Sequence, residues 1–471
     1  MYLLSWKENP IREVLAGLVV SFALIPEVIG FTIIEGIDPM IGLVSSFFIA
    51  IIVSFLGGRP GMVSAAAGSM ALVMVHLVKN YGLEYMFAAT VLTGLIQLLL
   101  GLCQAQKLMS WIPKPVMLGF VDALAILIFI AQFEHFDHAS IFMYGLVIGG
   151  ILLMVFAPKI ITIIPAGLIV IGVLTTVAAV GKLPVSTIGD LGDITPRFST
   201  FHLPMVPWSM ETLKIIFPTS LALAFVGMLE SLLTAEIVDE RTKSDSPKRQ
   251  ELLAQGSANL FSGLFAGVAG CAMIGQTIIN LDSKGRGRLS TVVAGVFMMV
   301  LIFALRPFLL LVPIAALVAI MSVVAFNTFD WSSINYVKEA PKKDVLIFLV
   351  TTISIVATGN LAIGVLVGVL ISAVLFVRSI SILKVEKEGS TIQISGELFF
   401  ATTTKMKSKL NALDLEENQL TLDLSQLRIW DSTGAEEMIK YKEKLRSTKQ
   451  VTVISPNTPS NDLIQSAKLY S

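Results

Sequence analysis

The feature that most constrains this chain is the recurrence of apolar runs long enough to cross a lipid bilayer. A helix needs about 20 residues to span a hydrocarbon core of about 30 Å, and runs close to this length follow one another as far as Arg378. Hydrophobic residues make up 55% of the chain, charged residues make up 14%, and the mean hydropathy is +0.80. These values exclude a soluble globular protein. We therefore expect an α-helical polytopic membrane protein.

The apolar runs predict fourteen transmembrane segments before residue 380. They divide into two sets of seven around the Pro- and Gly-bearing loop from Gly181 to Glu211, which gives repeats at about 1–180 and 212–380 of a transporter domain at 1–380. The N-terminus lacks a small-residue cleavage site, so we expect the first run to be retained as a membrane helix. The expected segments are 14–33, 39–56, 62–78, 84–102, 115–133, 141–157, 161–180, 213–234, 251–268, 270–281, 288–305, 307–325, 344–358 and 360–378.

The positive charges of the short loops predict the orientation. Lys and Arg concentrate on the cytoplasmic side of membrane proteins, and with the N-terminus inside most of the loop Lys and Arg fall on that side, including "GRGRL" at 285–289. An even number of spans then places both termini in the cytosol of a cell with a bacterial-type cytoplasmic membrane. Lys+Arg and Asp+Glu balance at 34 each, so the net charge indicates no nucleic-acid partner.

The composition changes after Arg378, where charged residues return. Strand-like alternation near 391–396, 419–424 and 450–454 is separated by helical spacing near 402–413 and 432–447. Strands that alternate with helices indicate an α/β fold. The sequence therefore predicts a small soluble domain over 389–471.

A carboxylate inside an apolar run is the first candidate for function. Glu230 lies in "AFVGMLESLLTAEIV", and an ionisable group at the centre of a membrane helix costs at least about 2.5–3.5 kcal/mol, so it indicates a partner or a polar cavity. The alternative is that the helix ends early and leaves Glu230 at the lipid headgroups. Aligning the two sets of segments places Glu27 opposite Glu230, so each half carries one embedded glutamate in its first helix. Seven spans per repeat give the two halves opposite orientations, which is typical of secondary transporters.

The third segment of each half is interrupted by small residues. "GRPGMVSAAAGSMALVMV" in the first half corresponds to "GVAGCAMIGQTIINL" in the second, which aligns Gly68 and Ser69 with Gly275, Gln276 and Thr277. If extended chain precedes each glycine, the helix that follows directs free backbone amides to the middle of the membrane, where they favour an anion. The alternative is ordinary close packing of small residues between membrane helices. The first interpretation makes these five residues a substrate-binding site and makes Glu230, with Glu27, the ion-coupling site.

Several of these segments together resemble the sulfate permease (SulP) family of anion transporters. The resemblance rests on "IPEVIGFTIIEGIDPMIGL", "ESLLTAEIVDERT", "ELLAQGSANLFSGLFAGVAGCAMIGQTIINLDSKGRGRLS" and "LFFATTTKMKSKL…LTLDLSQLRIWDSTGAEEM", and it covers essentially the whole chain. It implies a 7+7 inverted repeat shared with uracil permease, with core and gate domains, and a STAS domain in the tail. It also implies a homodimer, transport of sulfate, bicarbonate, chloride or dicarboxylates, and coupling to H+ or Na+.

The resemblance also identifies where this chain departs from its relatives. Many relatives have Gln where Glu27 stands and Ser-Arg where Gly275 and Gln276 stand, and the missing arginine favours a monovalent anion such as bicarbonate over a tightly held divalent one. Glutamate at the position of Glu230 is typical of proton-linked members. The motif "DSTG" matches a loop that is phosphorylated in antagonist relatives, which makes Ser432 a regulatory candidate. The simpler interpretation is that Asp431 or Ser432 caps the following helix.

These observations predict a secondary active transporter of small inorganic or carboxylate anions, coupled to H+ through Glu230. No nucleophile triad or metal cluster indicates an enzyme, and we expect no cofactor besides a coupling ion, H+ or Na+. The expected partners are a small anion, the bilayer, a second copy of the chain and a cytosolic protein at the STAS domain. The alternatives are an uncoupled anion channel or exchanger on the same fold, a nucleobase-type H+ symporter, and a membrane-tethered signalling protein.

Overall fold

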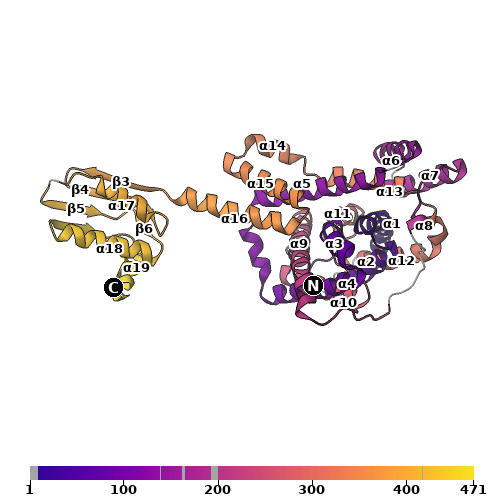
Figure 1. Cartoon of the computed structure of the whole chain (residues 1–471), viewed down its shortest axis with the longest axis horizontal. Coiled ribbons are helices and arrows are strands. Elements are labelled where there is room, and N and C mark those ends of the chain that lie inside the picture. Colours follow the sequence, from indigo (N-terminus) through magenta and orange to yellow (C-terminus); the bar gives the residue numbers. More distant parts are fainter. Residues whose placement is uncertain (1–8, 138, 162–164, 192–199, 416, 471) are drawn as a thin grey trace. The chain divides into compact units, whose positions relative to one another are not determined.

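The computed structural model describes residues 9–137, 139–161, 165–191, 200–415 and 417–470. The chain divides into two compact units, Met1–Val369 and Leu370–Ser471. The first unit is helical, and the second is built around a five-stranded sheet (Figure 1). The expected combination of a helical membrane domain and a C-terminal α/β domain is confirmed.

Each of the fourteen expected membrane segments overlaps a helix of the described residues, and residues 162–164 of the seventh segment lie outside them. Eight helices of the described residues are at least 18 residues long and apolar enough to cross a membrane. Ala166–Gly181 is a shorter apolar helix, and Arg288–Ala304 is an apolar part of the helix that ends at Leu310. The fourteen helices are α1 (Pro10–Glu35), α2 (Pro39–Leu56), α3 (Gly68–Tyr81), α4 (Leu83–Leu102), α5 (Lys114–Ala131), α6 (Ile141–Ile160), α7 (Ala166–Gly181), α9 (Met210–Thr242), α10 (Lys248–Leu264), α11 (Ile274–Asp282), α12 (Arg288–Leu310), α13 (Ile314–Thr328), α15 (Lys342–Thr358) and α16 (Leu361–Ile380).

Local signals explain where the first helices begin and end. Asn9 caps α1 through a hydrogen bond from the Arg12 amide, and Gly36 ends it in the left-handed conformation that glycine adopts most easily. Asp38 caps α2 in the same way by accepting from the Met40 amide. Several expected boundaries were wrong: α3 begins at Gly68 and not at 62, and α9 continues to Thr242 and not only to 234. In addition, α12 continues through Pro307 to Leu310, and α13 begins only after Pro313.

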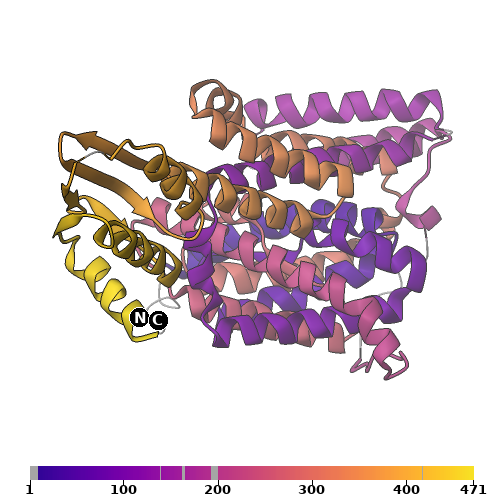
Figure 2. The ribbon, with the colours of Figure 1, turned by 60° about the vertical axis from the view of Figure 1, so that its left-hand side comes forward.

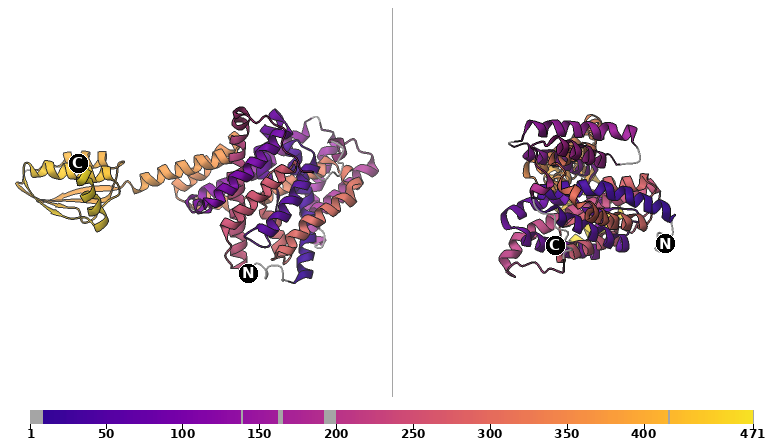
Figure 3. Two further views of the ribbon diagram at one scale, coloured as in Figure 1. Left: turned by 90° about the horizontal axis from the view of Figure 1, so that it is seen from below. Right: turned by 90° about the vertical axis from the view of Figure 1, so that its right-hand side faces the viewer.

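The membrane helices pack into two groups. α1–α4 contact α9–α12, whereas α5, α6 and α7 contact α13 and α15. Gly364 and Gly368 bring the start of α16 against Ile355 and Thr351 of α15, which places α16 in the second group. Each group thus combines the corresponding segments of the two halves, which intermingle in Figure 3. This pairing of equivalent segments is what an inverted 7+7 repeat requires, and the repeat remains our proposal.

Short elements connect these helices. A two-stranded antiparallel sheet joins β1 (Ser64–Ala66) to β2 (Gly270–Ala272) across the two halves. The other connections include the helices α8 (Ile188–Leu191) and α14 (Ser332–Glu339) and the 3₁₀ helices η2 (Ala105–Trp111) and η3 (Gln132–Phe136).

The second unit has the strand order β3-β4-β5-β7, and β6 also pairs with β4. β3 (Leu383–Glu388) is antiparallel to β4 (Thr391–Leu398), whereas β5 (Gln419–Asp423), β6 (Leu427–Ile429) and β7 (Gln450–Ile454) pair in parallel. The helices are α17 (Thr403–Asn411), α18 (Ser432–Arg446) and α19 (Thr458–Tyr470), and α18 and α19 lie side by side (Figure 2). Three expected strands and two expected helices are present. β3, β6 and α19 were not expected.

Candidate functional site

Two helices begin directly after the short strands β1 and β2, which pair with each other. Ala65 pairs with Cys271 in the middle of the two-stranded sheet, one residue from either end of each strand. α3 then starts at Gly68 and α11 starts at Ile274, so each strand leads directly into a half-helix. The interrupted segments expected from the sequence are therefore present, and they lie beside each other. The amide of Thr277 is the first in α11 that bonds back, to the Met273 carbonyl, so the amides before it have no acceptor within the helix.

Buried polar side chains from α2 and α10 hold the paired strands β1 and β2 in place. Asn259 of α10 pairs with both backbone groups of Gly270: its amide nitrogen donates to the carbonyl at 2.9 Å, and its amide oxygen accepts from the N–H at 2.8 Å. Ser46 of α2 accepts from the Ala66 amide at 3.0 Å, and Gln255 of α10 donates to the hydroxyl of Ser64 at 2.7 Å. Because an unmet backbone group would be costly here, these contacts fix the strands.

Thr277 belongs to this supporting set. Its hydroxyl accepts a hydrogen bond from the Val63 amide at 3.0 Å, and it does not line the cavity described below. In this structure Thr277 therefore attaches α11 to the chain entering β1, and its expected role in substrate binding stays a prediction.

Glu230 connects the two interrupted segments through its carboxylate. Both Ser69 Oγ, at the start of α3, and Cys271 Sγ, on β2, donate to Oε2 of Glu230, and the second of these distances is 3.1 Å. The side chain is only 8% exposed, and α9 continues well beyond it to Thr242. The helix therefore does not end at Glu230, which contradicts the alternative that an early helix end exposes this carboxylate.

A close approach of α3 and α9 makes this contact possible. Gly227 lies one turn before Glu230, and a Cβ atom there would be 2.2 Å from Cε of Met70 and 2.7 Å from Nε2 of Gln97. No larger residue fits at this position without displacing its neighbours. Gly227 therefore lets the start of α3 lie against the part of α9 that carries Glu230.

The space beside Glu230 is a cavity of about 620 Å³ between the two groups of helices. Its lining comes from α1, α3, α9 and α11 on one side and from α5 and α13 on the other, with the loop that leads to α14. It brings together six of the seven residues expected to bind substrate or couple ions: Glu27, Gly68, Ser69, Glu230, Gly275 and Gln276.

Gln276 lies beside Glu27 inside this cavity. It is 1% exposed, and its Nε2 is a buried donor without a well-formed hydrogen bond. Such a donor is costly unless a ligand or water satisfies it. The two glycines differ in their surroundings: a Cβ atom on Gly68 would be 2.5 Å from the Phe31 ring, whereas one on Gly275 would meet no atom within 4 Å. Gly68 therefore serves packing, and Gly275 keeps the cavity open.

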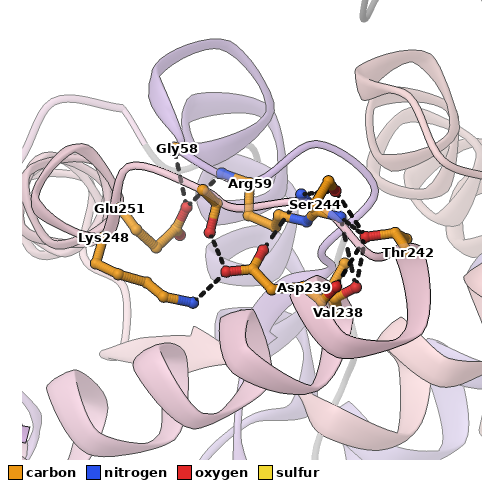
Figure 4. Close-up of polar contacts among 9 residues, drawn as sticks. Gly58, Arg59, Val238, Asp239, Thr242, Ser244, Lys248 and Glu251 are labelled. Carbon is orange, nitrogen blue, oxygen red and sulfur yellow. Dashed lines mark hydrogen bonds and ion pairs between the residues drawn. The ribbon is translucent and has the colours of Figure 1, made fainter.

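The described lining of the cavity contains three carboxylates, Glu27, Glu230 and Asp330, and no Lys, Arg or His. Two basic residues, Arg59 and Lys248, lie instead at the ends of the helices. Arg59, which precedes β1, forms an ion pair with Asp239 of α9 at 3.2 Å, and Asp239 also binds Lys248 at 2.6 Å (Figure 4). Burial lowers the pKa of the Arg59 guanidinium, and the charge of Asp239 opposes that shift. This ion-pair cluster joins α9, α10 and the chain entering β1.

In the second unit, Asp431 and not Ser432 caps α18. Oδ1 of Asp431 accepts from the Gly434 amide at 2.7 Å, and Oδ2 accepts from the Phe400 amide at 2.8 Å. Ser432 is exposed at the first position of the helix. The capping interpretation holds for Asp431, and phosphorylation of Ser432 stays a prediction.

Two residues of the site, Cys271 and Asn259, were not expected from the sequence. A single thiol in an apolar run shows no pattern, and Asn259 resembles any polar residue of an amphipathic helix. For Cys271 a signal was available, because the alignment of the two halves that identified Gly275 also includes the residues before it.

Comparison with known proteins decides the family. The sulfate permease family matches residues 11–142 and 137–351, and the STAS domain matches residues 382–470. The chain belongs to the sulfate permease family. It is 49% identical over 449 residues to the "Putative sulfate transporter YbaR" of Bacillus subtilis (strain 168), which covers 94% of this chain and 93% of that protein. It is 26% identical over 427 residues to the bicarbonate transporter BicA of Picosynechococcus sp., covering 83% of this chain and 75% of BicA.

Solved structures agree with the fold. The murine anion transporter Slc26a9 in its inward-facing state matches 99% of this chain and 90% of its own chain with a TM-score of 0.86 at 19% identity. The transmembrane domain of a cyanobacterial BicA matches 78% of this chain and 98% of its own, with a TM-score of 0.67 at 21% identity. These relatives make this chain a multi-pass membrane protein of an anion-transporting family.

Proposed function

We propose that the chain is a secondary active transporter that carries a small anion together with a proton. The observation that supports this most strongly is the contact of Glu230 with both Ser69 and Cys271, at the edge of a cavity reached by the starts of two half-helices. The substrate would be bound by free amides at the starts of α3 and α11, with Gly68, Ser69, Gly275 and Gln276 around it.

The charges in the cavity support proton coupling. No cation in the described lining balances the carboxylates of Glu27 and Glu230, so an anion entering the cavity would face negative charge at low dielectric. Protonation of these carboxylates removes the repulsion. The anion and the proton therefore bind best together, which is the thermodynamic basis of symport.

The ligands around Glu230 favour H+ over Na+. A sodium ion requires several oxygen ligands, as hard cations do, whereas the carboxylate oxygen Oε2 already accepts from a hydroxyl and from the thiol of Cys271. A thiol is a soft ligand and a poor replacement for oxygen. A proton on the other carboxylate oxygen needs no further ligands.

The same cavity favours a monovalent anion, of which bicarbonate is the first candidate and sulfate the second. Two half-helix N-termini supply about half a positive charge each, which matches one negative charge and leaves a second one unbalanced. We further propose that residues 1–380 form the transporter domain, that 389–471 form a cytosolic STAS domain for a protein partner, and that the chain works as a homodimer in the cell membrane with both termini in the cytosol.

A panel of solutes tests this function. The purified full chain is reconstituted in proteoliposomes, and uptake of labelled bicarbonate, sulfate, chloride, a dicarboxylate and uracil is measured with an imposed pH gradient, an imposed Na+ gradient or neither. We expect uptake of one or more anions that an acidic exterior accelerates and that a Na+ gradient does not. Anion uptake that depends on neither gradient would support the alternative of an uncoupled channel or exchanger. Uptake of uracil would support the alternative of a nucleobase symporter.

A further inference from the structure

A second cavity adjoins the substrate cavity at Glu27. It measures about 500 Å³ and shares four lining residues with the first: Glu27, Ile279, Val324 and Asn327. Glu230 lines the first cavity only. Of the two embedded glutamates, Glu27 is therefore the one that faces both spaces.

The second cavity extends away from the paired strands β1 and β2. Val19, Ala23 and Glu27 follow one face of α1 back toward its first residue, and Ser283 lies just beyond the last residue of α11. On the other wall the cavity reaches Pro158 near the end of α6 and Gly167 near the start of α7. All these positions lie toward the side of the membrane that we propose to be cytosolic.

The described lining of the second cavity is mostly apolar and offers an anion no basic side chain. Glu27 is its one titratable group among the described residues, with Ser283 and Asn327 as polar neighbours. The volume exceeds that of one water molecule, about 30 Å³, many times over. Neither Gly68 nor Gly275 borders it, so the half-helix amides that would hold an anion lie only in the first cavity.

We propose that the second cavity is a proton route, separate from the path of the anion, that connects Glu27 with the cytosolic side. This inference rests on the proposed function. The proton that Glu27 binds together with the anion leaves its carboxyl group for water in the second cavity, while the anion leaves through the first. The groups that face Glu27 are Gln276 on α11 and, across the first cavity, Glu230 on α9 and Asp330 before α14. The second cavity adds no further charge.

Filling the second cavity tests the route. A Cβ atom on Gly167 would lie 3.5 Å from Pro26 and 3.8 Å from Ile320, so a larger side chain there projects into the cavity without a backbone clash. Gly167→Leu is the first variant, and Ser283→Leu is a second at the far end in case the first does not fold. Gly172→Leu is the matched control, because Gly172 also lies on α7, has no atom within 4 Å of its Cβ position and does not line the cavity.

Two transport modes are measured for each variant in proteoliposomes with a labelled anion that the wild-type chain carries. Net uptake driven by a pH gradient requires release of the proton, whereas exchange of internal for external anion at equal pH does not. We expect both cavity-filling variants to lower net uptake about tenfold while exchange stays within about twofold, and the control to change neither.

Equal loss of net uptake and exchange would show that the anion itself uses the second cavity and would overturn the proposal. Unchanged net uptake in both variants would overturn it as well. If uptake by the wild-type chain did not depend on the pH gradient, that would instead contradict the proposed function. Failure of the proton route and failure of the proposed function therefore give different results.

Discussion

Oε2 of Glu230 accepts a hydrogen bond from the thiol of Cys271 at 3.1 Å, although the two residues lie 41 positions apart on different elements. The same oxygen accepts from Ser69 in the other half of the protein. One carboxylate is thus hydrogen-bonded to both interrupted segments. In the proposed mechanism, a change in its charge would alter how strongly these two segments are held together.

The thiol of Cys271 acts as a donor, and this predicts the effect of replacing it. Cys271→Ser keeps a donor of similar size, so we expect pH-driven uptake within about threefold of wild type. Cys271→Ala removes the donor and leaves a small void. If this costs about 1.4 kcal/mol in the transport cycle, the initial rate of pH-driven uptake falls about tenfold. Initial uptake rates at equal reconstituted protein test this pair, and equal rates for the two variants would show that the thiol does not support Glu230.

The two glycines at the half-helix starts predict opposite results for the same substitution. Gly68→Ala forces a Cβ atom to within 2.5 Å of the Phe31 ring, so we expect a loss of about 1–3 kcal/mol of stability, visible as a lower unfolding temperature in detergent. Gly275→Ala meets no atom and should unfold like wild type. Phe31→Leu should partly rescue Gly68→Ala if the clash is the cause. A normal melting temperature for Gly68→Ala would contradict the packing described here.

The described lining of the substrate cavity contains no basic residue, so adding one there should change which anion the chain prefers. Gln276→Arg places a guanidinium beside Glu27 in the substrate cavity, and a bidentate cation favours a doubly charged oxyanion. We expect sulfate to compete with labelled bicarbonate about tenfold better than in wild type. Gln276→Lys, which lacks the planar fork, is the control and should show a smaller gain. Unchanged competition by sulfate in both variants would mean that Gln276 does not contact the anion.

The ion pair between Arg59 and Asp239 attaches the chain entering β1 to α9 (Figure 4), and we expect it to contribute to the stability of the protein. Both side chains are largely buried. Asp239→Asn leaves Arg59 without its ion-pair partner, and we expect it to cost about 3–5 kcal/mol. Arg59→Gln should cost less, because Asp239 keeps its ion pair with Lys248. The double variant should cost less than the sum of the two. Denaturation of the full chain measures all three, and strict additivity would show that the pair contributes no interaction energy.

Much of this fold follows from local sequence patterns, and the exceptions have physical causes. The apolar run at 39–56 coincides with α2 residue for residue because Asp38, Pro39 and Gly57 mark its ends. β3 was not expected, because the four charged residues of "LKVEKE" obscure the alternation of buried Leu383 with exposed neighbours.

The candidate site was predictable as a set of segments but not as a set of contacts. Embedded glutamates and Gly-interrupted runs are visible one at a time, so Glu27, Glu230, Ser69 and Gln276 could be identified from the sequence. The role of Thr277 and the contact of Cys271 depend on the rotation of α11 and on the register of β1 with β2. Long-range pairing sets both, and a single sequence does not record it.

The most direct test of the account is pH-driven anion uptake by Glu230→Gln beside wild type. Glutamine preserves the size of the side chain and an acceptor for Ser69 and Cys271, but it cannot carry a transferable proton. We predict that an acidic exterior accelerates uptake by wild-type proteoliposomes and that Glu230→Gln loses at least about a hundredfold of this gradient-driven rate, while its unfolding temperature stays near that of wild type. Gradient-driven uptake by Glu230→Gln at the wild-type rate would contradict the central claim.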